Sequence, residues 1–408
     1  MQSVKAGIVG LGGRGIGLLK QIVKMPDVDI VSVCDLYEDR TKEGADITEK
    51  AKKVRPYETT DYKNILDKQK IDVLFIFCSW EDHIKVAIEA MERGIIVGLE
   101  VGGAYSVEDC WALVDTYERT GTPVMMLENC CYGKYELMVL NMVRQGLFGD
   151  VVHCAGGYQH DLRKEITHGK ENRHYRLNNY LNRNCENYPT HELGPIAKVL
   201  DINRGNIMVS LTSTSSSAKG LKQYIKDGKT QNPDLIDAEF KQGDIVTTVI
   251  KCKNGETITL TLDTTLPRSY SRGFTVRGTK AMYQEDNNML FEDGRFILYE
   301  FYGKPLWNNG RKYLRKYMHP IWRWYRKKGV RGGHGGMDYL VLRAFIEAVQ
   351  NGTHMPIDVY DTASWMVITP LSEISIKEGS IPQAIPDFTR GKYLNRTDKA
   401  EGLYNIDK

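Results

Sequence analysis

Short apolar runs rich in β-branched residues alternate with amphipathic helical patterns over the first 130 residues. The strand patterns lie at 5–9, 30–35, 73–78, 95–99 and 124–127, and the clearest helical patterns between them lie at 83–93 and 107–120. Strands that alternate with helices of this length favour a parallel sheet covered by helices on both faces. We therefore predict a doubly wound α/β domain over residues 1–130.

The pattern changes beyond this point. A helical pattern at 135–145 and a strand pattern at 151–158 precede a polar stretch, 160–187, which we predict to be loop. The later patterns are a helix at 191–200, alternating strands at 207–213, 245–251, 257–263 and 273–277, and closing helices at 337–350 and 360–378. Alternation of polar and apolar residues is typical of an open antiparallel sheet. We predict that residues 131–408 form an α+β domain with an open, mostly antiparallel sheet.

A glycine motif follows the first predicted strand directly. Gly10, Gly12 and Gly15 match GxGxxG and open an apolar helical run, and Asp35 ends the second strand 20 residues after the last glycine. Such a loop lets the backbone approach a pyrophosphate, and the acid accepts hydrogen bonds from a ribose hydroxyl. The motif predicts a Rossmann domain that binds NAD in preference to NADP. Arg14 leaves one question open, because it could meet a 2′-phosphate or the pyrophosphate.

Later loops at the carboxyl ends of the predicted strands are further candidates for cofactor contacts, since ligands bind at this edge of open α/β sheets. They are Ser79-Trp80-Glu81-Asp82-His83, Glu100-Val101-Gly102-Gly103 and Glu128-Asn129. Trp80 could lie against the nicotinamide or ribose, or cap the sheet as a packing residue. His83, Glu128 and Asn129 could equally serve as capping and turn residues.

The amino-acid composition excludes several classes of protein and of binding site. Hydrophobic residues make up 41% and charged residues 26%, and the net charge is +3. This is the balance of a globular protein, and the charge is too small to imply a nucleic-acid partner. The eight cysteines form no CxxC pair and the nine histidines no HExxH motif, so we expect no metal site. We expect a soluble chain without signal peptide or spanning helix, although a removed export signal would leave no trace.

The segment 311–331 is unusually basic, with nine Lys or Arg, no acid and five aromatic residues. Basic residues interleaved with aromatics can bind nucleic acid or a membrane surface. We favour a solvated, partly packed surface segment, because no nucleic-acid-binding fold is indicated elsewhere. Contact with an extended glycan is a third interpretation.

Several motifs together carry a family resemblance. The whole chain resembles the Gfo/Idh/MocA group of dinucleotide-dependent sugar enzymes, and within it glycoside hydrolase family 109, the NAD-dependent α-N-acetylgalactosaminidases. The motifs are Glu100-Val101-Gly102-Gly103, Glu128-Asn129, Tyr188-Pro189-Thr190-His191, the segment 201–206 and Gly332-Gly333-His334-Gly335-Gly336-Met337-Asp338. Sugar dehydrogenases of the wider group usually have Glu-Lys-Pro where this chain has Glu100-Val101-Gly102, so their catalytic lysine is absent. Their His-x-x-Asp helix start is also replaced, by His191-Glu192-Leu193-Gly194.

The resemblance implies two sets of binding residues. Carried over position by position, the contacts to NAD fall on Gly13, Arg14, Asp35, Trp80, Glu81, Asp82, His83, Glu100, Val101, Asn129 and Tyr188. Those to the sugar fall on Tyr158, Arg176, Tyr188, Pro189, Thr190, His191 and Tyr270.

The resemblance also implies an activity. It is hydrolysis of terminal α-linked N-acetylgalactosamine with retention, by oxidation at C3, elimination, water addition and re-reduction, so that NAD is not consumed. We expect Tyr158 to act as the base at C2, if nearby positive charge stabilises its phenolate, and His191 to act at C3 or at the leaving group. Tyr188 and Tyr270 would orient the sugar.

Two alternatives remain open, an NAD-dependent sugar dehydrogenase and a noncatalytic sugar-binding protein on the same fold. The expected partner is a glycan with terminal N-acetylgalactosamine. We expect no nucleic acid and no membrane span. The open sheet of the second domain is a candidate surface for a homo-oligomer.

Overall fold

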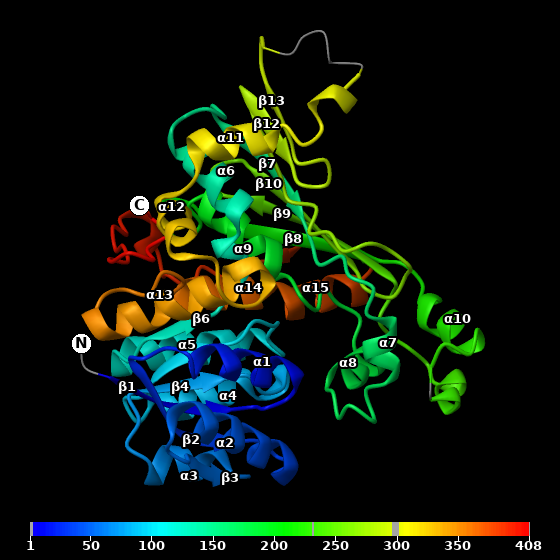
Figure 1. Cartoon of the computed structure of the whole chain (residues 1–408). Coiled ribbons are helices and arrows are strands. Elements are labelled where there is room, and N and C mark those ends of the chain that lie inside the picture. Colours follow the sequence, from blue (N-terminus) through cyan, green and yellow to red (C-terminus); the bar gives the residue numbers. More distant parts are fainter. Residues whose placement is uncertain (1–2, 231, 296–301, 408) are drawn as a thin grey trace. The chain divides into compact units, whose positions relative to one another are not determined.

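The computed structural model describes residues 3–230, 232–295 and 302–407 (Figure 1). The chain divides into two compact units. The first comprises Met1–Tyr132, Pro320–Ala363 and Thr397–Lys408, and the second comprises Gly133–His319 and Ser364–Arg396. The first unit thus includes two segments from the C-terminal part of the chain, whereas the sequence pattern indicated a boundary at residue 130 alone.

A parallel sheet forms the centre of the first unit, as predicted. Among the described residues it has six strands in the order β3-β2-β1-β4-β5-β6. The strands are β1 (Val4–Val9), β2 (Val28–Cys34), β3 (Tyr57–Thr59), β4 (Val73–Ile76), β5 (Ile96–Leu99) and β6 (Val124–Met126). Strand β4 is fully buried, which explains its unbroken apolar sequence, since helices cover both faces of a parallel sheet. Strand β3 was not predicted; it has three residues, none of them buried, so it offers no apolar pattern.

The helices of the first unit follow the strands. They are α1 (Gly13–Ile22), α2 (Glu38–Lys52), α3 (Tyr62–Lys68), α4 (Trp80–Met91), α5 (Val107–Thr120), the short η1 (Asn129–Tyr132), α12 (Pro320–Lys328) and α13 (Met337–Asn351). Helix α5 illustrates how local sequence sets the bounds. The Ser106 hydroxyl accepts a hydrogen bond from the backbone N–H of Asp109 at its start, and Gly121 ends it with φ +69°. Helix α13 packs against α1 and η1.

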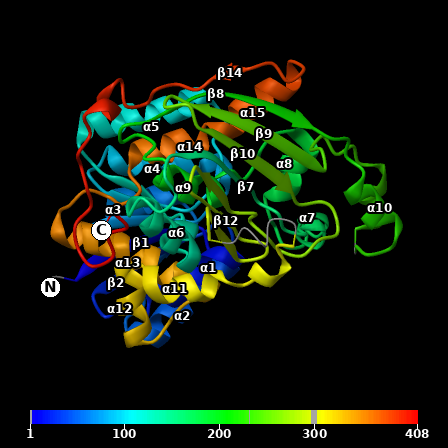
Figure 2. The ribbon, with the colours of Figure 1, turned by 90° about the horizontal axis from the view of Figure 1, so that it is seen from above.

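The second unit is built on a mostly antiparallel sheet, which confirms the predicted class. Its eight strands, counted over the described residues, run in the order β13-β12-β11-β7-β10-β9-β8-β14. Figure 2 shows β7, β10, β9 and β8 side by side. They are β7 (Val151–Gly156), β8 (Met208–Ser215), β9 (Ile245–Cys252), β10 (Thr257–Asp263), β11 (Thr275–Gly278), β12 (Ala281–Gln284), β13 (Met289–Glu292) and β14 (Gln383–Ala384). The pair β7 and β10 is parallel.

The polar stretch 160–187 contains two helices, so the prediction of a continuous loop was wrong. They are α7 (Arg163–Thr167) and α8 (Arg176–Asn182). Helix α8 buries Leu177 and Tyr180, a spacing of three that places both side chains on one face. Two apolar residues among asparagines are too few to stand out as a periodic pattern.

The predicted helix 360–378 is in fact two helices, α14 (Val359–Met366) and α15 (Ile368–Lys377). Pro370 lies in the first turn of α15. A proline has no N–H to donate to the preceding turn and its ring clashes there, so the helix restarts at this point. Other helices of the second unit are α6 (Lys134–Arg144), α9 (Thr190–Val199), α10 (Gly220–Lys226) and α11 (Gly310–Tyr317). Helix α15 packs on β8.

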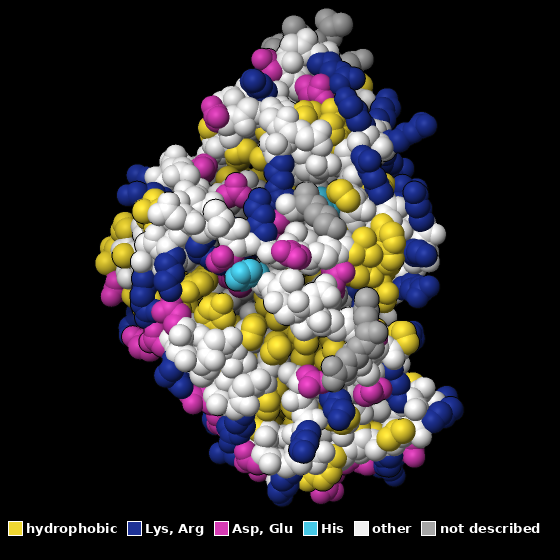
Figure 3. All heavy atoms as spheres, turned by 90° about the vertical axis from the view of Figure 1, so that its left-hand side faces the viewer, with side chains coloured by type: hydrophobic (Ala, Val, Ile, Leu, Met, Phe, Trp, Pro, Cys, Tyr) yellow, Lys and Arg dark blue, Asp and Glu magenta, His cyan; other side chains and the backbone are white. Residues whose placement is uncertain are grey.

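The basic segment 311–331 folds as α11, in the second unit, and α12, in the first. Most of its aromatic rings are buried, namely Tyr313, Tyr317, Trp322 and Tyr325. These rings therefore pack inward, while most of the basic side chains lie at the surface. On the face drawn in Figure 3, Lys and Arg side chains are interspersed with Asp and Glu. Among the described residues, no helix has the length and apolar character needed to cross a membrane.

Candidate cofactor and sugar sites

The glycine loop between β1 and α1 closes tightly against its neighbours. Gly10 has φ +96°, and a Cβ on it would overlap the backbone of Cys78 at the end of β4. A Cβ on Gly15 would overlap the carbonyl of Gly10. By contrast, a Cβ on Gly13 would meet nothing within 4 Å. The loop thus leaves open space at the first turn of α1, as a pyrophosphate requires.

Asp35 lies directly after β2 with its carboxylate fixed by backbone groups. Its Oδ2 accepts a hydrogen bond from the N–H of Leu11 at 2.7 Å, and its Oδ1 accepts one from the N–H of Tyr37 at 3.1 Å. The residue is 8% exposed. Each oxygen retains a further lone pair, so the carboxylate can still accept from a ribose hydroxyl. The residues of the loop and of this strand end fit an adenine dinucleotide.

The segment 80–83 opens helix α4. Trp80 is buried over Gly102, where a Cβ would overlap the indole ring, so it packs against the loop after β5. Glu81 is exposed, and Asp82 accepts a hydrogen bond from the Ser79 hydroxyl at 3.1 Å.

His83 is fully buried, and burial lowers its pKa to about 4. The ring is therefore neutral, and its Nε2 lies 3.1 Å from the carbonyl oxygen of Cys78, to which it donates as the N–H tautomer. This bond ties helix α4 to the end of strand β4.

Arg14 is held by two carboxylates of the first unit. Its Nε donates to Glu100 Oε1 at 2.8 Å, and its Nη1 and Nη2 donate to the two oxygens of Asp338 at 2.9 and 3.1 Å. Asp338 also accepts from Asn129 Nδ2 at 2.7 Å and lies 2.8 Å from His334 Nδ1. Burial works to raise the pKa of Asp338, but the bonds to His334 and Arg14 outweigh it and hold that pKa well below its usual value. The guanidinium of Arg14 therefore forms hydrogen bonds with Glu100 and Asp338 in this structure.

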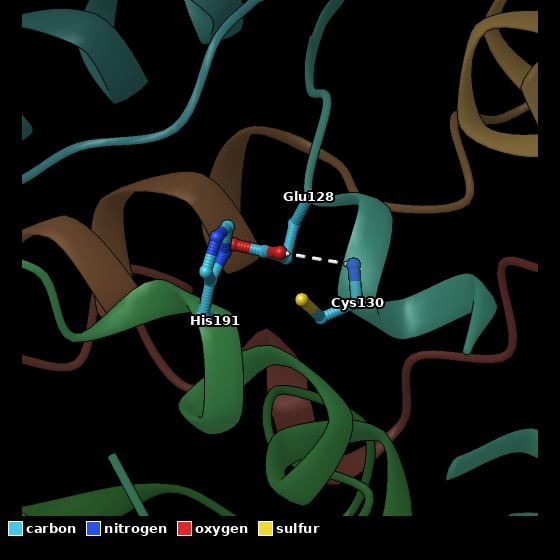
Figure 4. Close-up of side chains that lie close together, drawn as sticks. All are labelled: Glu128, Cys130 and His191. Carbon is cyan, nitrogen blue, oxygen red and sulfur yellow. Dashed lines mark hydrogen bonds between the residues drawn. The ribbon is translucent and has the colours of Figure 1, made fainter. Parts of the chain in front are cut away.

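The ends of β5 and β6 complete the cofactor side. Glu100 Oε2 accepts from the N–H of Val101 at 2.6 Å, and Val101 is buried. As a valine, this residue carries no ammonium group. Glu128 Oε1 accepts from the N–H of Cys130 at 3.0 Å (Figure 4).

In the second unit, three predicted sugar-side residues form one aromatic cluster. The ring centroids of Tyr158 and Tyr188 lie 4.3 Å apart, and His191 stands edge-on to both, at 5.4 Å from Tyr158 and 4.7 Å from Tyr188. Tyr158 and Tyr188 are each 7% exposed. His191, drawn in Figure 4, comes from the first turn of α9. A loop and a helix start therefore bring side chains 33 residues apart into contact.

Arg176 places a positive charge against this cluster. Its Cζ lies 5.1 Å from the Tyr188 ring centroid and 5.7 Å from that of Tyr158. Its Nε lies 2.8 Å from Glu165 Oε1. Burial works to lower the pKa of Arg176, but Tyr158, Tyr175 and Glu165 hold it well above the usual value, so the guanidinium is always charged.

The remaining predicted residues lie around the cluster. Tyr270 is 53% exposed, and its ring centroid lies 5.3 Å from that of His160. Pro189 is the N-cap of α9. Thr190 is completely buried, and its hydroxyl has no hydrogen-bond partner among the described residues.

Comparison with known proteins places these features in a family. Residues 132–395 match the family model of the glycosyl hydrolase 109 C-terminal domain. Residues 4–128 match that of the Gfo/Idh/MocA oxidoreductase family, NAD-binding Rossmann fold. A "glycosyl hydrolase family 109 protein" of Stenotrophomonas maltophilia (strain K279a) is 39% identical over 97% of this chain and 91% of its own. The chain belongs to glycosyl hydrolase family 109. Its N-terminal part is an NAD-binding Rossmann domain.

Other relatives and structures agree. An "alpha-N-acetylgalactosaminidase" of Tannerella forsythia is 36% identical over 96% of this chain and 88% of its own. Among solved structures, levoglucosan dehydrogenase in complex with NADH and levoglucosan covers 94% of this chain and 100% of its own, with a TM-score of 0.68 and 15% identity. An inositol dehydrogenase homolog from Azotobacter vinelandii, complexed with NAD+, has a TM-score of 0.65 and 14% identity. At these identities the structures show the shared fold.

Two residues of this family 109 chain escaped sequence reasoning. His160 has its Nδ1 3.2 Å from the Tyr158 hydroxyl. Its position two residues after Tyr158, in extended chain, was an available signal, since alternate residues share a face. Asp338 belongs to a glycine-rich motif that was noted, but nothing local shows that its partner is Arg14, 324 residues away.

Proposed function

We propose that this family 109 protein is a retaining glycosidase that hydrolyses terminal α-linked N-acetylgalactosamine with a bound NAD. The cluster of Tyr158, Tyr188 and His191 with Arg176 is the observation that carries the proposal. It offers two phenols, an imidazole and a fixed positive charge, which suit proton transfer at a sugar ring. The name of the Tannerella relative supports the choice of sugar.

When bound, NAD supplies an oxidant for sugar C3 and the reductant that later restores it, which makes the C2 proton acidic and allows elimination and re-addition of water. The glycine loop and Asp35 would hold its pyrophosphate and ribose, with Glu100, Val101 and Asn129 as further contacts. Because residue 101 is a valine, this edge of the sheet lacks the lysine that the resemblance assigns to dehydrogenases at this position.

Tyr158 is the proposed base at C2. Its hydroxyl has a proton acceptor within reach, His160 Nδ1 at 3.2 Å, and burial lowers the pKa of His160, so the ring is available in its neutral form. The guanidinium of Arg176 stabilises the phenolate that results. The proton taken from C2 would pass through these groups to the departing oxygen, and a proton from the entering water would later replace it at C2.

His191 is the proposed group at the C3 hydroxyl or at the leaving oxygen. The first turn of α9 fixes its backbone, and the two tyrosine rings fix its side chain. Tyr188 and the exposed Tyr270 would orient the sugar. Arg176, Pro189 and Thr190 complete the proposed contact set.

The test uses an aryl α-N-acetylgalactosaminide with the purified full chain. Release of the aryl group without net NADH formation, together with exchange of a C2 deuteron into solvent, is the expected result. Steady accumulation of free NADH would instead support the alternative, an NAD-dependent sugar dehydrogenase. No cleavage of any aryl glycoside would support a sugar-binding protein.

Variants assign the roles. Tyr158→Phe and His191→Ala should each lower kcat by roughly a hundredfold or more, as expected for loss of a general acid or base. Tyr224→Phe, on the separate helix α10, removes a phenol outside the cluster and should leave kcat unchanged. Full activity of both cluster variants would refute the assignment.

A further inference from the structure

The residue that follows His191 in the first turn of α9 is a completely buried glutamate. Glu192 is 0% exposed, and its Oε1 lies 3.3 Å from the Nε of Arg272, so the two side chains form a buried ion pair. Because such a pair offsets the cost of burying its charges only at close approach, this contact fixes the position of Glu192. Neither the sequence motifs nor the resemblance gave this glutamate a role.

The side chain of Glu192 also lies against the end of β7. A Cβ on Gly156 would be 2.6 Å from the Cβ and 2.7 Å from the Cγ of Glu192, so the strand can approach the glutamate this closely only because Gly156 has no side chain. Tyr158 follows Gly156 by two residues. Glu192 therefore contacts the strand that leads to Tyr158 and belongs to the helical turn that carries His191.

Arg272 joins the same two segments. Its carbonyl oxygen accepts a hydrogen bond from the N–H of Gly157 at 2.8 Å, and its guanidinium pairs with Glu192. The guanidinium also pairs with Glu136 and, at 3.2 Å, with Glu285. The Arg272 side chain is 10% exposed, so these contacts hold it inside the second unit.

We infer that Glu192 is a positioning residue, which sets the distance between the Tyr158 phenol and the His191 imidazole. The inference rests on the proposed function, in which these two groups transfer protons at one sugar ring. Their ring centroids lie 5.4 Å apart. Proton transfer requires hydrogen-bond distances, and a misplacement of about 1 Å can lower a rate by about a hundredfold. Because it is completely buried, Glu192 acts without touching the sugar.

The first test removes the charge of Glu192 and keeps its shape. Glu192→Gln leaves two carboxylates paired with Arg272, so the unit should fold, but the side chain no longer forms the ion pair. In the full chain with an aryl α-N-acetylgalactosaminide, kcat should fall by roughly tenfold or more, while KM and the affinity for NADH stay within about twofold. Glu285→Gln is the matched control, because Glu285 pairs with the same guanidinium; its kcat should stay within about twofold of wild type.

The second test changes the contact and leaves the charge in place. Gly156→Ala puts a methyl group 2.6 Å from the Cβ of Glu192, whereas two carbon atoms in ordinary contact lie about 3.5–4 Å apart. The end of β7 and the first turn of α9 must then separate by about 1 Å, and kcat should again fall by roughly tenfold or more at nearly constant KM. Gly303→Ala is the control, since its methyl group would lie 3.8 Å from Met289 Sδ. Gly156→Ala decides the question if Glu192→Gln does not fold.

Three results would overturn the inference. The first is a wild-type kcat in both Glu192→Gln and Gly156→Ala. The second is a higher KM at constant kcat, which would make Glu192 a contributor to sugar binding. The third is an equal loss of kcat in Glu285→Gln, which would show a general effect of the pairs with Arg272. Failure of the wild type to release the aryl group would instead contradict the proposed function, and it is read before any residue is changed.

Discussion

Replacing Asp338 with asparagine keeps the shape of the side chain and removes its charge. In the wild type its two oxygens accept from Arg14, Asn129 and, at 2.8 Å, His334. Asparagine offers one acceptor oxygen and one NH₂ group, so at least one of these donors would face another donor. We expect the first unit to lose stability, because the network links α1, the end of β6 and the start of α13.

The size of the loss follows from burial. Breaking a fully buried ion pair costs about 3–5 kcal/mol. The Asp338 side chain is 4% exposed but that of Arg14 is 34% exposed, so water can rehydrate the arginine and reduce the cost. We therefore expect a loss of about 2 kcal/mol. For a domain of about 150–250 residues, a loss of about 2 kcal/mol in the free energy of unfolding lowers Tm by about 4–8 °C.

The pH dependence gives a stricter test. The folded-state pKa of Asp338 is depressed, so its stabilising effect is present above the unfolded value of about 3.9 and is lost as the pH falls toward the folded value. The difference in Tm between wild type and Asp338→Asn should be constant near neutral pH and shrink below about pH 4. Calorimetric melts over this range measure it. Asp46→Asn, which breaks a surface pair with Arg55, should leave Tm almost unchanged, because both side chains are exposed. Equal melting of wild type and Asp338→Asn at neutral pH would refute the reasoning.

Three further changes test other parts of the structure. Gly10→Ala should unfold the glycine loop and abolish nucleotide binding, because φ of Gly10 is +96° and the added methyl group would overlap the backbone. Gly13→Ala is the control and should change the free energy of unfolding by less than about 1 kcal/mol, because its methyl group would meet nothing within 4 Å. Thermal melting and nucleotide titration measure both variants. Burial raises the pKa of Glu186 to about 8, so wild type should lose stability relative to Glu186→Gln as the pH rises from about 4.5 to about 8; parallel melts showing no such trend would contradict this. Arg272→Met should destabilise the second unit by about 3 kcal/mol or more, because the arginine pairs with the buried Glu136; denaturant unfolding measures it.

Five of the six strands described in the first unit could be predicted, because burial on both faces forces an unbroken apolar sequence, whereas β3, which has no buried residue, could not. Strand β4 is predicted at 73–78 and observed at Val73–Ile76. Asp35 and the three glycines could also be placed, because a GxGxxG motif between a strand and a helix predicts a dinucleotide-binding loop at the end of that strand. The predicted helices were wrong in two places. A single proline, Pro370, divides the predicted helix 360–378 into two, and helix α8 was missed because only Leu177 and Tyr180 form its apolar face.

The candidate sites could also be predicted only in part from the sequence. Residue types could be assigned to the cofactor side and the sugar side, and the structure brings Tyr158, Tyr188 and His191 together. Their catalytic roles stay predictions. Charge partners could not be assigned, because nothing in the local sequence shows that Arg14 pairs with Asp338. Such pairs depend on which helix ends the fold brings together.

The two arginines of these sites differ in how their charge is balanced, and the difference bears on function. Arg14 faces two carboxylates that are each at most 7% exposed, so its charge is compensated within the protein. Arg176 pairs with Glu165, which is 39% exposed, and lies against two buried tyrosine rings. A neutral phenol compensates little of a guanidinium charge, whereas a phenolate compensates nearly all of it. The proposed base at C2, Tyr158, thus has a fixed positive charge 5.7 Å from the centroid of its ring, which is the arrangement that a phenolate intermediate would require.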